Sequence, residues 1–230
     1  MSNLQQRIEK IEYDIQDVCQ RIGRKRSDIT VVAVTKEVSA ARASAMIEAG
    51  FANLGENRPE VLLDKQETIQ SGAKWHFIGN VQSRKVKDII NRIDYLHSVD
   101  RISIAKEIHK RADHIIDCFI QVNVSGEESK SGVTPAELKN FIEQMAAYDK
   151  IRIVGLMTMA PFTEDVDLIR SVFRSLRQLR DGIAALELPY APCTQLSMGM
   201  SNDFIIAIEE GATHVRIGTA LVGAESGEDA

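Results

Sequence analysis

Hydrophobic residues recur every three or four positions over the first part of the chain, with polar and charged residues between them. The recurring positions are Leu4, Ile8, Ile11, Ile15, Val18 and Ile22. On an α-helix this spacing places the apolar side chains on one face, so it predicts an N-terminal amphipathic helix within residues 1–23 that ends at Gly23. The spacing also fits a coiled-coil seam, but the run is short, and packing onto the chain's own domain explains it better.

From residue 29 onward, short apolar runs alternate with helical patterns. The predicted strands span residues 29–34, 51–54, 75–78, 95–99, 115–124, 152–157, 194–197 and 214–217. The predicted helices between them span residues 40–49, 59–70, 83–91, 103–112, 135–148, 165–186 and 202–210. Eight strands separated by seven helices are the pattern of a single-domain α/β fold, the (β/α)8 or TIM barrel.

The alternative to a closed barrel is a doubly wound open sheet, because a sequence does not reveal whether the first and last strands pair. No linker-like segment or change of composition divides the chain, so we expect one domain over residues 1–230. The polar residues 225–230 are expected to fray.

Composition and charge narrow the class of protein. The chain is 44% hydrophobic and 27% charged, with a net charge of −5, which gives no bulk basic field for nucleic acid. No apolar run approaches the length of a membrane span, and no leader-type segment opens the chain. The cysteines Cys19, Cys118 and Cys193 lie far apart and predict neither a disulfide nor a metal site. We therefore expect a cytoplasmic protein that does not bind nucleic acid or membranes.

The stretch 28–38 contains the first candidate for chemistry. Its β-branched run reads as a buried strand, and a side-chain period of two places Val32, Val34 and Lys36 on one face. If the valines face a core, the lysine amine lies at its edge, where desolvation would lower its pKa and make it a nucleophile toward an aldehyde. The alternative is a strand-end lysine whose amine reaches solvent.

In a barrel of this kind, functional residues lie at the carboxyl ends of the strands, and a phosphate site often forms after strands seven and eight. The corresponding loops here contain Ser201, at a predicted helix start, and Gly218-Thr219. Exposed backbone N–H groups and two hydroxyls would suit a phosphate group, and Gly218 allows its close approach. Ser201 alone would be explained equally well as a helix N-cap.

Three further features have structural as well as functional explanations. Arg216 has the strand parity of Gly218 and should point inward, either to pair with a buried carboxylate or to donate to a ligand. His76 is either a core histidine or part of a site. The methionines Met157, Met159, Met198 and Met200 are expected to line a pocket or the core.

Motifs along almost the whole chain resemble one family, the pyridoxal 5′-phosphate (PLP) homeostasis proteins of the YggS/PROSC type. They are VAVTK ending at Lys36, GENR at 55–58, WHFIG at 75–79, QSRK at 82–85, SVD at 98–100, SKSG at 129–132, GLMTMAP at 155–161, LSMGMSNDF at 196–204 and VRIGTALVG at 215–223. One departure is Asn80-Val81, where the family often has His-Leu.

The resemblance implies a TIM barrel similar to the N-terminal domain of alanine racemase. It implies PLP as the cofactor, held as a Schiff base (an aldimine) on Lys36, and no metal. The implied phosphate contacts are Ser201, Gly218 and Thr219, and the implied partner of the pyridine nitrogen is Arg216. The remaining implied cofactor-binding residues are Asn57, His76 and Met200.

The expected function is to hold PLP and to buffer or deliver it without evident catalysis. An arginine at the pyridine nitrogen cannot accept a proton, and after Gly223 the given sequence contains no second domain to bring a second base. Tyr95 begins a strand and should face the opposite end of the barrel. The alternatives are a PLP-dependent amino-acid racemase or lyase, and a Schiff-base aldolase that uses the same lysine without PLP. We expect a monomer, with apo PLP-dependent enzymes as the recipients of the cofactor.

Overall fold

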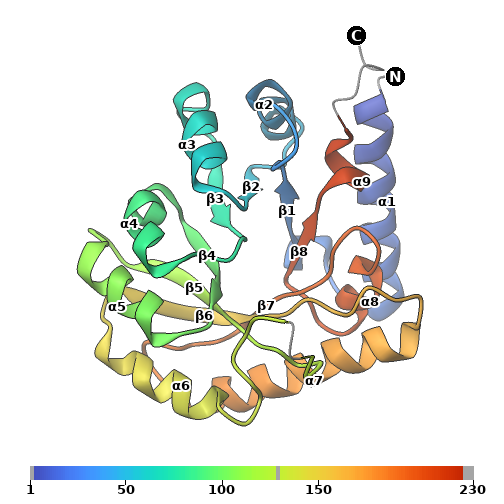
Figure 1. The fold of residues 1–230 in the computed structure, drawn as a ribbon. Helices are drawn as coiled ribbons and strands as arrows, with labels where there is room; N and C mark the ends of the chain where they lie inside the picture. The colour runs from blue at the N-terminus through green and yellow to red at the C-terminus, as the bar shows by residue number, and fades with distance from the viewer. Residues whose placement is uncertain (1–2, 128–129, 225–230) are drawn as a thin grey trace.

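The strands form a closed parallel barrel in sequence order, as the computed structural model shows (Figure 1). The structure describes residues 3–127 and 130–224, so the expected fraying of residues 225–230 lies outside the described residues. The strands are β1 (Thr30–Val34), β2 (Asn53–Glu56), β3 (Lys74–Phe77), β4 (Tyr95–Val99), β5 (Ile116–Gln121), β6 (Ile151–Met157), β7 (Gln195–Ser197) and β8 (His214–Ile217).

Closure depends on the pairing of β1 with β8. The two strands run parallel, with Thr30 opposite His214, Val32 opposite Arg216 and Ala33 opposite Ile217. This register leaves the sheet without a free edge between its first and last strands, so the TIM-barrel prediction is confirmed and the open sheet is wrong.

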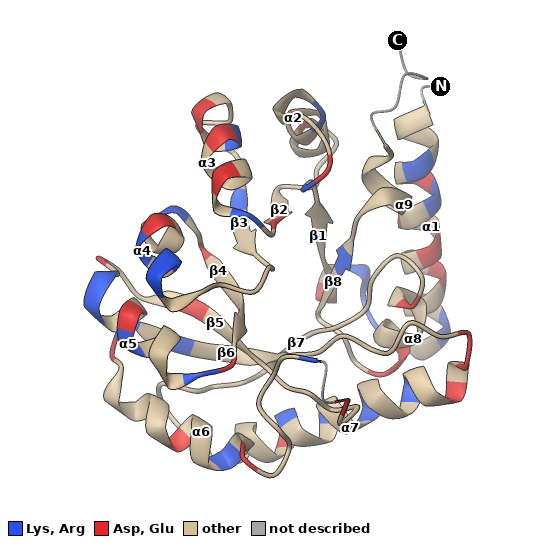
Figure 2. Cartoon of the chain, viewed as in Figure 1, with Lys and Arg blue, Asp and Glu red and all other residues tan. Residues whose placement is uncertain are grey.

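Helices surround the strands (Figure 1). They are α1 (Asn3–Ile22), α2 (Ala40–Glu48), α3 (Pro59–Thr68), α4 (Val86–Ile89), α5 (Ile102–Arg111), α6 (Leu138–Gln144), α7 (Val166–Ala184), α8 (Phe204–Glu209) and α9 (Thr219–Val222). Short 3-10 turns are η1 (Arg26–Asp28), η2 (Ser83–Lys85), η3 (Ile90–Arg92) and η4 (Met145–Ala147). The N-terminal helix packs against α8 and α9, as its apolar face predicts, and Figure 2 shows charges of both signs along its length.

Several predicted element bounds are wrong. The predicted helix 83–91 is divided into η2, α4 and η3, and the predicted strand 115–124 ends at Gln121. The predicted helix 202–210 begins only at Phe204, because residues 201–203 form a turn. In that turn the side chain of Asp203 accepts a hydrogen bond from the backbone N–H of Met200 at 2.5 Å. The short helix α9 was not predicted.

The apolar core lies mainly between the strands and the surrounding helices. Side chains such as Val31, Leu54 and Phe77 fill this layer. A small separate apolar cluster, Phe119, Val154 and Met157, lies beside buried polar side chains such as His76, His97 and Ser197. Within residues 3–127 and 130–224, the helices all lack the combination of length and apolar content that a bilayer crossing requires.

Candidate functional site

The closed parallel sheet brings the carboxyl ends of all the strands to one end of the barrel, which we call the mouth. Lys36 follows β1, Asn57 follows β2, Ser201 follows β7, and Gly218 with Thr219 follows β8. The fold therefore gathers at one end residues that are up to 183 positions apart in the chain (36 and 219).

Lys36 lies two residues beyond the end of β1. Val32 is paired with Arg216, which points into the barrel, and a Cβ built on Gly55 would contact the side chains of both Val32 and Val34, so the two valines share that inward face. The chain turns after β1, however, and the lysine side chain is 42% exposed, with its Nζ 4.0 Å from Oε1 of Glu37. This exposure agrees with the alternative of a strand-end lysine whose amine reaches solvent, and the amine is accessible at the mouth.

A buried ion pair lies behind the Lys36 loop. Lys65 of α3 donates to Oε1 of Glu56 at 2.7 Å, and the two side chains are 3% and 0% exposed. The same ammonium donates to the backbone carbonyl of Thr35, and the Thr35 hydroxyl donates to Glu56 Oε1 at 2.5 Å. Thr35 directly precedes Lys36, so this buried group is connected to the candidate nucleophile through one peptide bond.

Arg216 points into the barrel, as its strand parity predicts. Its guanidinium donates to the Ser197 hydroxyl at 2.6 Å and to the Thr158 carbonyl at 3.0 Å. Burial lowers the pKa of Arg216 to about 10, and the nearby Asp203 carboxylate opposes this shift. The arginine remains a cation and a donor at neutral pH.

A chain of hydrogen bonds leads from Arg216 through the barrel interior. The Ser197 hydroxyl lies 2.8 Å from Nδ1 of His97, and Nε2 of His97 lies 2.9 Å from Nδ1 of His76. Nε2 of His76 lies 3.0 Å from Oδ1 of Asn53. Arg216 can only donate hydrogen bonds, and the amide oxygen of Asn53 can only accept them. Each hydrogen bond in this series is therefore donated by the group nearer to Arg216 and accepted by the group nearer to Asn53. This direction defines the tautomer of both histidines.

The barrel histidines are neutral at pH 7. Burial is the main cause that lowers the pKa of His76 and His97 well below the usual value of 6.5, and nearby positive charge adds to it. Burial also lowers the pKa of His214 to about 4, with a contribution from the Arg216 charge. The series of hydrogen bonds requires His76 and His97 to be neutral, because only a neutral imidazole ring has one donor and one acceptor nitrogen.

The hydrogen bonds of His76 hold it inside the barrel and not at the rim. The residue is fully buried, both ring nitrogens have partners, and its ring stacks on Tyr95 at a centroid distance of 4.4 Å. These contacts favour the core-histidine alternative. Tyr95 is the first residue of β4, at the end of the strand away from the mouth.

The loops after β7 and β8 supply backbone and hydroxyl donors. Ser201 is half-buried in the turn before α8, whose N-cap is Asp203, so Ser201 is not the cap of that helix. Thr219 is exposed at the start of α9. A Cβ on Gly218 would meet Val34 at an ordinary distance of 3.7 Å, so packing within the chain does not require glycine at this position.

The methionines divide into two groups. Met157 and Met198 are buried, whereas Met159 is 40% and Met200 38% exposed. The first pair belongs to the core, and the second lies on the loops after β6 and β7. Only the second pair could contact a ligand at the surface of the mouth.

Sequence reasoning missed His97, Ser197 and Gln121. Oε1 of Gln121 and Oδ1 of Asn57 are buried, and both lack a hydrogen-bond partner within the described part of the chain. Both residues lie at or just beyond strand ends, on β5 and after β2. Unpaired buried polar atoms at the mouth suit a polar ligand.

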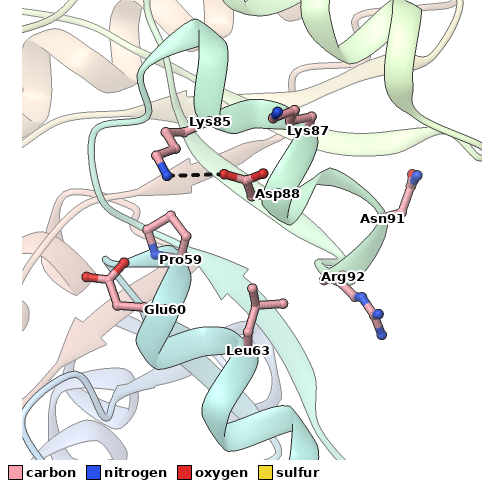
Figure 3. A pocket seen from close by; sticks show the side chains of 8 residues that line it. All are labelled: Pro59, Glu60, Leu63, Lys85, Lys87, Asp88, Asn91 and Arg92. Atoms are coloured by element: carbon pink, nitrogen blue, oxygen red, sulfur yellow. Dashed lines mark ion pairs between the residues drawn. The ribbon is translucent and has the colours of Figure 1, made fainter.

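A surface groove lies elsewhere, on the outside of the barrel (Figure 3). It measures about 590 Å³ and lies between α3 and the η2–α4 segment, with Pro59, Lys87 and Arg92 among its lining residues. Lys85 and Asp88 form an ion pair at 3.4 Å on one side of the groove, drawn as a dashed line in Figure 3. None of the candidate site residues lines this groove. Among the residues that the structure describes, no three potential metal ligands cluster.

Residues 7–226 match the family model "Alanine racemase, N-terminal domain". The chain is 40% identical over 228 residues to the "Pyridoxal phosphate homeostasis protein" of Aquifex aeolicus, which covers 96% of this chain and 98% of the relative. It is 35% identical to the protein of the same name from Escherichia coli strain K12, with 97% of each chain covered.

A solved structure gives the same result. The structure of PipY from Synechococcus elongatus with PLP bound matches with a TM-score of 0.80 and 27% identity, covering 91% of this chain and 100% of that chain. Sequence and fold therefore agree over nearly the whole length of the chain.

Proposed function

Because the chain belongs to the alanine racemase N-terminal domain family, among relatives named pyridoxal phosphate homeostasis proteins, we propose that it binds PLP at the barrel mouth and buffers or delivers it. One observation carries this proposal. Val32 and Arg216 are directly paired on the adjacent strands β1 and β8, and Lys36 and Gly218 follow those strands at the mouth. An accessible amine, a buried cation and a loop suited to phosphate thus lie around one opening.

The residues of the mouth fit the parts of PLP. Lys36 offers the amine that would bond covalently to the aldehyde. Ser201, Gly218 and Thr219 would hold the phosphate, since Gly218 has room for close approach and the two hydroxyls are on adjacent loops. When bound, PLP supplies an electrophilic carbonyl and an aromatic ring that can accept electrons.

Arg216 would donate to the pyridine nitrogen from its buried position. It cannot give that nitrogen a proton at neutral pH, which limits the ring as an electron acceptor. Asn57, with its unpaired Oδ1, and the half-exposed Met200 would contact the ring from the side. His76 would not contact the ring directly. It would support the position of Arg216 through its hydrogen bond to His97 and the contact of His97 with Ser197.

These properties favour a carrier over a racemase or lyase. We propose that the chain acts as a monomer and that its recipients are apo forms of PLP-dependent enzymes. An accessible Lys36 suits exchange of the cofactor, because a recipient's own lysine can reach the same opening.

The test is transfer of PLP. Purified protein is loaded with PLP, freed of excess, and mixed with an apo PLP-dependent enzyme, and recovery of that enzyme's activity is compared with the same amount of free PLP. We expect faster or more complete recovery from the loaded protein than from free PLP in the presence of a competing amine. Equal recovery from both sources would refute delivery, and turnover of an amino acid by the protein itself would favour the racemase or lyase alternative.

Covalent loading is tested in parallel. Borohydride reduction should leave one pyridoxyl mass on Lys36, and Lys36→Ala should remove both this label and the visible absorbance. Lys87→Ala, in the outer groove, is the matched control and should keep both. A colourless, unlabelled wild-type protein would favour the aldolase alternative.

A further inference from the structure

Four hydrogen bonds hold Thr35, the residue that precedes Lys36. The N–H of Thr35 donates to the carbonyl of Gly55 at 3.1 Å, and its hydroxyl donates to Glu56 at 2.5 Å. The Thr35 carbonyl accepts from Lys65 Nζ and from the N–H of Val38 at 3.1 Å. Every polar group of Thr35 therefore has a partner, and these partners come from β2, α3 and the loop after β1.

Stability alone does not explain the charged pair in this group. Glu56 is fully buried and Lys65 nearly so, and removing two charges from water costs more than such a pair usually returns. Oε2 of Glu56 is also buried without a hydrogen-bond partner among the described residues, which adds to that cost. Apolar residues of similar size would fill the space between β2 and α3 equally well.

The ion pair makes a contact that apolar residues could not make, because the Lys65 ammonium donates a hydrogen bond to the backbone at the end of the neighbouring strand, β1. Its ammonium connects α3 to the Thr35 carbonyl, and Glu56 orients that ammonium and the Thr35 hydroxyl together. Lys36 itself is 42% exposed and lies beyond the strand pairing of β1, so its backbone takes its position from Thr35.

We propose that Glu56 and Lys65 are positioning residues for Lys36: through Thr35 they hold the lysine backbone so that the amine meets the PLP aldehyde. This inference rests on the proposed function. In the step concerned, the neutral Lys36 amine attacks the aldehyde carbon, a carbon–nitrogen bond forms, and the aldehyde oxygen leaves as water with the two amine hydrogens. Glu56 and Lys65 exchange no proton or electron in this step and act only on the placement of the amine.

The double variant Glu56→Leu/Lys65→Met tests this inference, since it removes both charges and leaves none unpaired in the core. We expect it to fold with a melting temperature near that of the wild type. We expect the rate constant for covalent attachment of PLP, followed by absorbance and by borohydride trapping, to fall by about ten-fold or more, because a small displacement of a reacting group has effects of this size.

A matched control is the double variant Asp117→Leu/Arg152→Met. It removes a bidentate ion pair (2.6 and 2.8 Å) near the start of β5 and β6, at the opposite end of the barrel. It should keep the wild-type attachment rate. Lys65→Arg, which keeps a cation that can donate to Glu56 and to Thr35, should recover part of the rate lost on removal of the charges.

A second measurement does not depend on PLP. Amide hydrogen exchange at Thr35 and Val38 should be about ten-fold faster or more in the first double variant, with exchange in β8 unchanged, because the Thr35 carbonyl loses its Lys65 donor. If that variant does not fold, Thr35→Val removes the hydroxyl contact alone and should give a smaller change in the same direction.

The outcomes separate the two proposals. Wild-type attachment rate and unchanged exchange in a folded double variant would overturn the positioning role and leave the proposed function intact. Absence of attachment in the wild type would refute the proposed function, and the exchange measurement would then decide by itself whether Glu56 and Lys65 hold the Lys36 loop.

Discussion

Nδ1 of His97 lies 2.8 Å from the Ser197 hydroxyl, and this contact joins a buried cation to a pair of neutral histidines inside the barrel. The hydroxyl accepts from Arg216 and donates to His97, so one small side chain satisfies two buried groups. The arginine is held in a defined orientation, and no carboxylate of residues 3–127 or 130–224 forms an ion pair with it. It therefore keeps a positive charge free to act on a ligand.

The first prediction concerns Ser197. Ser197→Ala leaves Arg216 Nη1 and His97 Nδ1 without this shared partner, and an unsatisfied buried polar group costs about 1–3 kcal/mol. We expect the free energy of unfolding to fall by about 2 kcal/mol or more, measured by urea denaturation. Ser83→Ala, which removes an exposed hydroxyl pair with Ser103, is the control and should change stability little. An unchanged Ser197→Ala midpoint would show that the hydroxyl is not needed to satisfy the chain.

The second prediction concerns pH. The folded His214 has a pKa of about 4, whereas an unfolded histidine titrates near 6.5. Between these values the unfolded chain binds a proton that the folded chain does not, so the free energy of unfolding decreases as pH falls from 6.5 to 4. The loss from His214 alone amounts to about 3 kcal/mol, and His76 and His97 act in the same direction.

Denaturation curves at several pH values between 7 and 4 check this prediction. His214→Gln should reduce the slope of stability against pH, because it removes the group whose pKa is lowered to about 4 in the folded chain. A stability that stays constant over this range would contradict the neutral, buried histidines.

The third prediction concerns the charge beneath the cofactor. Arg216→Glu places a carboxylate where it can share a proton with a ring nitrogen, so the absorption of Lys36-bound PLP should shift and become dependent on pH. Arg216→Gln, which offers no acid group, should give a spectrum with no such dependence. A spectrum of Arg216→Glu that matches the wild type at every pH would mean that residue 216 does not face the ring.

Much of the fold could be predicted because the alternation of apolar runs and helical patterns is local. The alternation alone could not distinguish a closed barrel from an open sheet, since closure depends on the pairing of Val32 with Arg216, 184 residues later in the chain. Strand parity correctly placed Arg216 inside the barrel. The same reasoning failed for Lys36, because the chain turns after Val34 and parity holds only within a strand.

The polar interior could not be predicted for a related reason. His97 and Ser197 are isolated polar residues in short strands, and their contact joins positions 100 residues apart. The available signal was the presence of polar side chains within otherwise apolar strands, at His76, His97 and Ser197. Such residues are buried only when they satisfy one another, so each one predicts a partner without identifying it.

The fourth prediction compares Gly218, where ligand binding would require a glycine, with Gly155, where the packing of the strands requires one. A Cβ at Gly218 would meet Val34 at 3.7 Å, whereas a Cβ at Gly155 would lie 2.1 Å from the carbonyl oxygen of Gln195. Gly218→Ala should therefore fold normally and bind PLP more weakly, with inorganic phosphate competing less well, because the methyl group restricts approach to the backbone of this loop. Gly155→Ala should instead lose stability, since β6 and β7 would have to move apart. Thermal unfolding and PLP titration of both variants check the pair, and a Gly218→Ala protein with wild-type affinity would remove this loop from the phosphate site.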